Sequence, residues 1–413
     1  MKIEVFLLTA HCSLLMPSIC LCFRVHLPYS LKNYSFWDFS RGNNAFLNEA
    51  ETARLLTEKA DKDWLPMNRK LRELVQKHQG LFKTAFYISG VTLEQMATYR
   101  KDAIDSFANL SWSGGAEFLG GTCCHSLSYL YSKTEFLRQT KRHSEQIYQY
   151  FDQSPMVYVQ PDELYADEMA FLLRDKMYAK GVLCEVTEDK LRGRRKSFVY
   201  SPQQSKRPSI LIQHQEYGKQ FVEMFAKGGE AVKEFVNTLR TELSRDEVAV
   251  IYVDYADLMQ NAQSVNVWEA FAKTVFSFPD LHLLTPSMLV ARYNPIDNLY
   301  KGNDNIVEKP NWLKNPFQHS LLNKLYEMEG AVSLCANKEV KDLWGKLQTV
   351  DYYKHIKEKN GMAFIPNELT PAYFDTGKPL PHTDYNNLAS MIARLQCWVN
   401  SEQLAVSSHQ VAR

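Results

Sequence analysis

Short apolar runs of strand length alternate with amphipathic helical segments over most of the chain, and this alternation constrains the fold more than any other feature. Continuous apolar strands separated by amphipathic helices are typical of a parallel sheet, because helices cover both faces of such a sheet. Seven or eight such units over about 270 residues fit an α/β barrel, which typically needs about 250 residues. The predicted strands are 19–25, 82–88, 116–119, 156–160, 181–185, 210–213, 248–254 and 281–285.

Segments with helical periodicity fill the intervals between these strands. After Arg292 the alternation stops, and the remaining residues form helices joined by proline-containing loops. The predicted helices between strands are 49–59, 68–77, 93–110, 134–151, 167–180, 218–243 and 265–278, and those after Arg292 are 318–331, 336–348 and 385–401.

These patterns divide the chain into four parts. Residues 1–17 form an N-terminal extension, 18–292 the barrel, 293–405 a helical region that packs on the barrel, and 406–413 a polar tail.

The N-terminal extension is apolar enough to suggest a signal peptide, but His11 interrupts it and no clean cleavage site follows. Cleavage near Cys20 would also remove the first predicted strand. We therefore expect residues 1–17 to be unstructured or to belong to a misassigned start, with the natural start near Met16. No other segment is long enough to span a membrane.

Composition argues against several classes of partner and site. The chain has 48 basic and 47 acidic residues, a net charge of +1, so it offers no electrostatic basis for binding nucleic acid or an anionic membrane. We interpret the basic run 190–196 as a solvated loop. The eight cysteines include no CxxC pair with metal spacing, and we expect reduced, mostly buried thiols and a cytoplasmic protein.

Polar residues follow several of the predicted strands, where the functional residues of an α/β barrel lie. His26 follows the first strand, His125 lies in the loop after 116–119, Asp162 and Glu163 follow 156–160, and Asp254 ends 248–254. Two carboxylates are what glycosidic bond cleavage needs, one to protonate the leaving oxygen and one to attack the anomeric carbon or activate water. Each residue alone is equally well explained as a cap or a buried hydrogen-bonding group. Their collection at one rim favours a site.

Several short segments, in a fixed order and spacing, together resemble one enzyme family from about Ser18 onwards. They are ICLCFRVHLP at 19–28, LKNYSFWD at 31–38, LPMN at 65–68, FYISGVTLEQ at 86–95, EFL at 117–119, HSL at 125–127, WLKNPFQ at 312–318, NKLYEME at 323–329 and LQTVD at 347–351.

This pattern is similar to the family 57 glycoside hydrolases, especially their α-amylase-like members. The resemblance implies an incomplete seven-stranded (β/α) barrel followed by a helical region. It also implies an α-glucan or maltooligosaccharide as substrate, without a cofactor or metal.

The resemblance also implies residue roles. Asp254 matches the family's acid/base residue. The nucleophile falls on Asp162 if Tyr165-Ala-Asp167 is aligned without a gap, or on Glu163 if one deletion is allowed. The residues implied in substrate binding are His26, His125, Tyr255 and Trp37.

Departures from the family pattern gather around the same rim. Residues 256–259 and 213–219 leave the family motifs, Leu27 replaces a glutamine, and Gly121 replaces a glutamate. An aspartate nucleophile would be one methylene shorter than glutamate, and a misplacement on the order of 1 Å can cost about a hundredfold in rate. We therefore predict a changed or lost activity.

Three functions remain open from the sequence. The first is an α-amylase-like glycoside hydrolase whose two-carboxylate retaining mechanism is impaired. The second is a non-catalytic glucan-binding or regulatory protein on the same barrel. The third is a metal-dependent, deacetylase-like enzyme with His26, His125 and Asp254 as ligands. The separate positions of the histidines, without HxxH-type spacing, disfavour the third.

Overall fold

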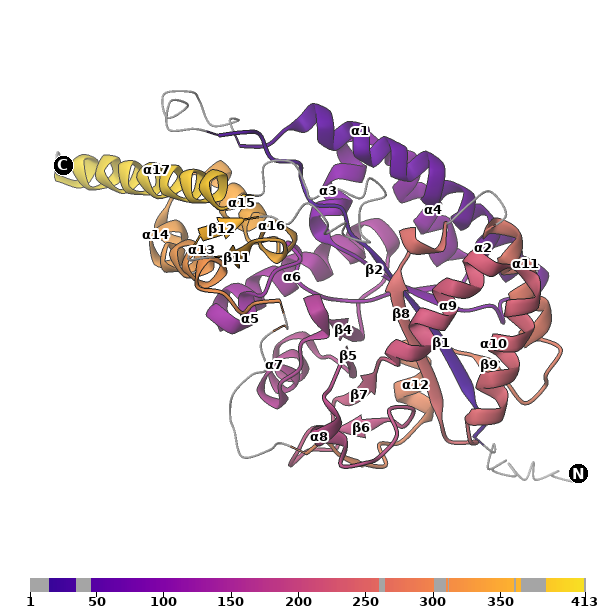
Figure 1. Cartoon of the computed structure of the whole chain (residues 1–413). Helices are drawn as coiled ribbons and strands as arrows, with labels where there is room; N and C mark the ends of the chain where they lie inside the picture. Colours follow the sequence, from indigo (N-terminus) through magenta and orange to yellow (C-terminus); the bar gives the residue numbers. More distant parts are fainter. Residues whose placement is uncertain are drawn as a thin grey trace, which may run out of the picture.

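A computed structural model describes residues 15–34, 46–259, 264–300, 310, 312–359, 362–364 and 384–411. Seven parallel strands in this part of the chain form an open barrel (Figure 1). They are β1 (Ser18–Val25), β2 (Thr84–Ile88), β3 (Ala116–Phe118), β4 (Val157–Val159), β5 (Gly181–Cys184), β7 (Ser209–Ile212) and β8 (Val248–Asp254).

The barrel is made of two sheets joined at one side and left open at the other. One sheet has the order β3-β2-β1-β8, with β9 (His282–Leu283) also paired to β1, and the other contains β7-β5-β4. An isolated bridge between Gly120 and Tyr158 connects β3 to β4. Between β7 and β8 the described residues form no ladder, although the amide of His214 donates to the carbonyl of Val250 at 2.8 Å. This arrangement confirms the predicted incomplete seven-stranded (β/α) barrel.

The two faces of β1 account for its continuous apolar sequence. Cys20 and Cys22 belong to the cluster inside the barrel, whereas Leu21 and Phe23 belong to the larger cluster that the helices cover. Phe23 packs against rings from other elements, including Phe86. A strand buried on both faces needs apolar side chains at every position, and this need explains why the strand was readable from the sequence.

Helices surround the barrel on its outer face (Figure 1). Three predicted helices are each split into two in the structure. The segment 93–110 is broken at Arg100, whose φ of −146° and ψ of 67° are not helical, and 218–243 is broken at Gly228, whose φ is +84°. The segment 318–331 is broken at Met328, between the helices Pro316–Glu327 and Glu329–Leu334. The helices are α1 (Glu49–Lys59), α2 (Leu65–Lys77), α3 (Gly90–Tyr99), α4 (Lys101–Trp112), α5 (Ser128–Tyr131), α6 (Lys133–Phe151), α7 (Asp167–Met177), α8 (Glu188–Leu191), α9 (Gln215–Lys227), α10 (Gly229–Glu242), α11 (Ser264–Val275) and α12 (Pro286–Arg292).

The C-terminal region is mainly helical and lies beside α5 and α6 (Figure 1). Buried contacts tie it to the barrel, such as the 2.7 Å hydrogen bond from Gln139 Nε2 to Gln348 Oε1. The last helix, α17 (Tyr385–Val411), extends away from the barrel and includes 406–411, which the sequence assigned to a polar tail. The other helices are α13 (Pro316–Glu327), α14 (Glu329–Leu334), α15 (Lys338–Leu347) and α16 (Asp351–Lys354).

Two sequence-based expectations about the whole chain can be compared with the described residues. None of the helices there combines the length and apolarity that crossing a membrane requires. Seven cysteines fall within this part of the chain, and all are free thiols; Cys12 lies outside it.

Candidate functional site

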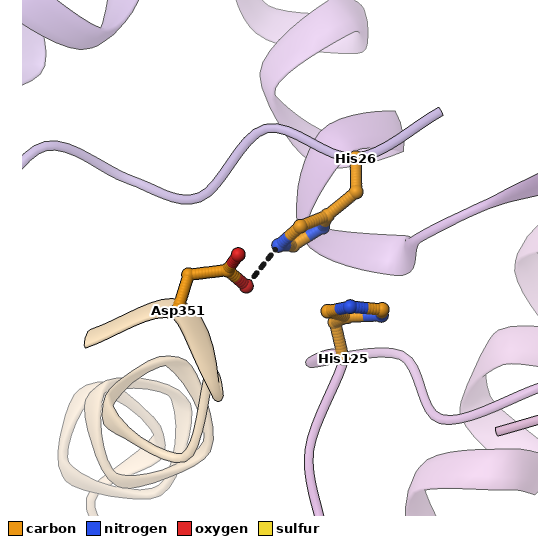
Figure 2. Close-up of side chains that lie close together, drawn as sticks. All are labelled: His26, His125 and Asp351. Atoms are coloured by element: carbon orange, nitrogen blue, oxygen red, sulfur yellow. Dashed lines mark hydrogen bonds and ion pairs between the residues drawn. The ribbon is translucent and has the colours of Figure 1, made fainter. Parts of the chain in front are cut away.

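Three side chains from distant parts of the chain meet at the C-terminal ends of the barrel strands (Figure 2). His26 follows β1, His125 lies in the loop after β3, and Asp351 begins α16 in the C-terminal region. His26 Nε2 lies 2.9 Å from Asp351 Oδ2, and the two imidazole rings lie 4.1 Å apart between centroids. The side chains of His26 and Asp351 are 1% and 3% exposed. The sequence brought His26 and His125 to one rim but gave no role to Asp351.

A chain of hydrogen bonds holds the ring of His26. Its Nδ1 lies 2.7 Å from Ser89 Oγ, and Ser89 Oγ lies 2.8 Å from Thr92 Oγ1. The Thr92 hydroxyl can donate either to Ser89 or to the carbonyl of Leu27, which lies 3.3 Å away. When Thr92 donates to Ser89 and Ser89 donates to Nδ1, the His26 proton sits on Nε2 and points at Asp351. Ser89, His26 and Asp351 thus have the connectivity of a hydrolytic triad. However, Ser89 is fully buried and caps the N-terminus of α3, so its hydroxyl positions the imidazole rather than attacking a substrate.

His125 is held in an unusual backbone conformation, with a φ of +50°. Its side chain is buried, and Nδ1 lies 3.4 Å from the hydroxyl of Tyr87, which donates to the carbonyl of Thr122. No hydrogen-bond partner of Nε2 is found among the described residues. Burial, followed by the nearby His26, lowers the pKa of His125 well below its ordinary value, so this ring is neutral at physiological pH.

Asp254 is paired with an arginine on the neighbouring strand. Arg24 stands opposite Asp254 in the parallel register of β1 and β8. Arg24 Nε donates to Oδ1 at 2.6 Å and Nη2 donates to Oδ2 at 2.8 Å, and both side chains are 10% exposed. Such a two-bond fork favours the ionised carboxylate and uses both oxygens as acceptors. Both oxygens of the predicted acid/base residue are therefore engaged by Arg24.

Asp162 is held in a similar way by the C-terminal region. It follows β4 with a φ of +53°, in a short 3₁₀ turn, Pro161–Glu163. Lys354 Nζ lies 2.9 Å from Oδ1, and Trp312 Nε1 donates to Oδ2 at 2.9 Å. Burial alone would lower the pKa of Lys354, but Asp162 and Asp351 outweigh it and raise that pKa. The backbone of Glu163, the other nucleophile candidate, belongs to the same turn, and its side chain lies outside the described residues.

The structure places Tyr255 in the core rather than at a surface that a sugar could reach. The side chain is fully buried, and its ring packs between Phe23 and Phe86. The hydroxyl donates to Asn68 Oδ1 at 2.8 Å. Tyr255 therefore fills a packing position in this structure. Trp37, also predicted to contact substrate, lies outside the described residues.

Gly121 occupies a place in the rim with no room for a side chain. A Cβ there would lie 2.5 Å from the ring of Tyr87 and 2.7 Å from the carbonyl oxygen of Val159. The Gly121 amide donates to His143 Nδ1 at 3.1 Å. The family resemblance implies a glutamate at this position. This chain has Gly121 there instead, and the ring of Tyr87 packs against its backbone.

His26, His125 and Asp351 are also the set of described side chains whose donor atoms could converge on one metal ion. One ring nitrogen or carboxylate oxygen from each lies within 4.8 Å of the other two. The sequence-based metal hypothesis placed Asp254 in this role. The structure corrects that choice, because Asp254 is engaged by Arg24 and Asp351 stands beside the imidazoles instead.

The basic run 190–196 borders a separate cavity of about 370 Å³ between α8 and α9. Three of the five cationic side chains of this run are paired with acids: Arg194 with Asp297, Arg195 with Glu247, and Lys196 with Glu188. The other two, Lys190 and Arg192, lie over the rings of Tyr165 and Tyr300. Acidic neighbours thus compensate much of the positive charge of this run.

Sequence comparison identifies a family match for most of this barrel. Residues 20–300 match Glycosyl hydrolase family 57. A Methanocaldococcus jannaschii protein, provisionally named an alpha-amylase, is 23% identical over 384 residues, which span 86% of this chain and 79% of that protein.

Solved structures share the fold at low sequence identity. The α-amylase AmyC from Thermotoga maritima has a TM-score of 0.61 at 10% identity and covers 94% of both chains. A GH57-type branching enzyme from Pyrococcus horikoshii has a TM-score of 0.61 at 12% identity, with 82% of this chain and 85% of the other aligned. The 4-alpha-glucanotransferase from Thermococcus litoralis has a TM-score of 0.60 at 15% identity. The aligned part is 82% of this chain but 56% of that longer enzyme.

Proposed function

This chain belongs to glycosyl hydrolase family 57, and we propose that it binds α-glucans at the C-terminal rim of its barrel with weak or absent hydrolysis. The names of the similar proteins support the choice of ligand, since an α-amylase, a branching enzyme and a 4-α-glucanotransferase all act on α-glucans. We propose that His26 and His125 contribute to this site. Nε2 of His125 has no hydrogen-bond partner among the described residues, whereas His26 would have to release Ser89 or Asp351 before it could bond a sugar hydroxyl.

The ion pair between Asp254 and Arg24 supports the second half of the proposal, that hydrolysis is weak or absent. A retaining glycosidase needs one carboxylic acid that can protonate the leaving oxygen and a second carboxylate that attacks the anomeric carbon. Arg24 donates to both oxygens of Asp254, so neither oxygen is available to a leaving group unless this contact breaks. Asp162 is similarly held by Lys354 and Trp312 and is one methylene shorter than glutamate. Neither carboxylate is free to play its part without first breaking these contacts.

Glucan binding without hydrolysis is directly measurable. We expect the full chain to be retarded in native gels that contain glycogen, while reducing ends released from maltoheptaose stay at the background level. His26→Gln should reduce the retardation, because it removes an imidazole from the rim. Trp112→Ala is the matched control, since Trp112 is 71% exposed on α4 and belongs to no contact described at the site. Absence of retardation in wild type would refute glucan binding.

We further propose that the barrel, 18–292, and the helical region, 293–405, form one functional unit. The proposal rests on the origin of the site residues, since Asp351, Lys354 and Trp312 all come from the second part and contact barrel residues. Coexpression of the two parts as separate chains should restore glycogen binding only when both are present. The free thiols in the described part are compatible with a cytoplasmic protein, which we also propose.

A further inference from the structure

We infer that His26, His125 and Asp351 form a binding site for a divalent transition-metal ion of the zinc class. Two imidazoles and one carboxylate are ligands that such ions bind, and three protein ligands leave a fourth position for water or a hydroxyl. The three side chains converge from the residue after β1, the loop after β3, and the start of α16 (Figure 2). This inference goes beyond the proposed glucan binding and does not depend on it.

The distribution of charge at the rim supports a bound cation. Arg24 is in direct contact with Asp254, and Lys354 is in direct contact with Asp162. The direct ion-pair contact of Asp351 is with His26, and its side chain is 3% exposed. A buried carboxylate that lacks a full countercharge costs several kcal/mol. Lys354 also acts electrostatically on Asp351, and a divalent ion between Asp351 and the imidazoles would add positive charge directly at this buried carboxylate.

The unpartnered nitrogen of His125 is an independent observation. Its Nε2 is buried and has no hydrogen-bond partner among the described residues, which costs about 1–3 kcal/mol in an empty site. The positive φ of His125 adds backbone strain at the same residue. An ion bound by Nε2 would give that nitrogen a partner. The occurrence of both unfavourable features at one rim residue therefore supports a bound ligand.

The second ring nitrogens have the contacts expected around a metal ligand. Histidines that bind metals usually donate the other N–H to a neighbouring oxygen, which fixes the ring orientation. His26 Nδ1 lies 2.7 Å from Ser89 Oγ, and His125 Nδ1 lies 3.4 Å from the hydroxyl of Tyr87. If His26 donates through Nδ1 to Ser89, its Nε2 lone pair faces Asp351, where the ion would lie. Binding therefore replaces the proton that otherwise joins His26 to Asp351.

The test uses the full chain, expressed without a polyhistidine tag and stripped with a chelator. Titration with Co²⁺ should give visible d–d absorption that saturates at one equivalent per chain, and added Zn²⁺ should abolish it. Asp351→Asn and His125→Gln should each weaken Co²⁺ binding by at least about tenfold. His78→Gln should leave it unchanged, because His78 lies on α2's C-terminal end, stacked on Phe276.

The wild-type measurement stands even if a site variant fails to fold. A folded wild-type chain that gives no d–d absorption, and retains no Zn²⁺ after gel filtration, would overturn the inference. Equal binding by wild type and a folded Asp351→Asn variant would also overturn it. Neither readout involves glucan, so this result is separate from the outcome of the glycogen experiment.

Discussion

Arg24 and Asp254 stand opposite each other on β1 and β8, and the guanidinium of Arg24 holds both carboxylate oxygens of Asp254, at 2.6 and 2.8 Å. The adjacent parallel strands set this contact, so it needs no loop movement to form. Under the proposed function, this contact is what keeps Asp254, at the position matched to the family's acid/base residue, from taking part in hydrolysis.

A double-mutant cycle measures how strongly these two residues interact. Arg24→Met should lower the free energy of unfolding by about 3 kcal/mol, because it leaves a nearly buried carboxylate without its cation. Asp254→Asn should also destabilise the protein, and the double variant should lose less than the sum of the two. Urea unfolding followed by tryptophan fluorescence measures each free energy.

The exposed pair Arg240 and Asp280 provides the control cycle. These side chains are 44% and 42% exposed, so we expect their interaction to stay below about 1 kcal/mol. Additive effects of Arg24→Met and Asp254→Asn would contradict the role that we assign to their contact.

The packing around Gly121 predicts a strong effect of one added methyl group. Gly121→Ala should destabilise the fold by about 3 kcal/mol, because the new Cβ would meet the Tyr87 ring and the backbone oxygen of Val159. Gly330→Ala, in α14, should be neutral or stabilising by up to about 1 kcal/mol, because nothing lies within 4 Å of its Cβ. Thermal unfolding of both variants checks the contrast. Equal melting temperatures would show that the Gly121 pocket tolerates a side chain.

The buried His143 predicts a specific dependence of stability on pH. Burial lowers its pKa from 6.5 to about 4, so between these values the unfolded chain binds a proton that the folded chain does not. The free energy of unfolding should therefore fall with falling pH in this window, by up to about 1.4 kcal/mol per pH unit from this group. His143→Gln removes that contribution. The stability difference between wild type and His143→Gln should shrink from pH 7 to pH 5, and a constant difference would contradict the assignment.

Much of the barrel could be predicted because strands buried on both faces leave a continuous apolar signal. All eight predicted strands correspond to strands of the structure, within a few residues at each end. The helix breaks at Arg100, Gly228 and Met328 were missed, since the apolar periodicity continues across these positions. The periodicity of apolar residues shows which face of a helix is buried. Two consecutive helices that pack on the same surface therefore give one continuous pattern, and the break between them leaves no signal.

Only part of the candidate site could be predicted from the sequence. His26, His125, Asp162 and Asp254 follow predicted strands, so the barrel topology alone gathers them at one end. Asp351, Lys354 and Trp312 come from the C-terminal region, whose position depends on tertiary packing that no local pattern encodes. Arg24 did leave a signal: a charged residue near the end of an apolar strand needs a buried partner, and identifying that partner required the β1–β8 register.

The release of reducing ends from maltoheptaose by wild type and by Asp254→Asn tests the central claim most directly. If Arg24 keeps Asp254 from acting as an acid, both proteins should show the same rate, at or near that of a blank, while both are retarded by glycogen in native gels. Robust wild-type hydrolysis that disappears in Asp254→Asn would contradict the account.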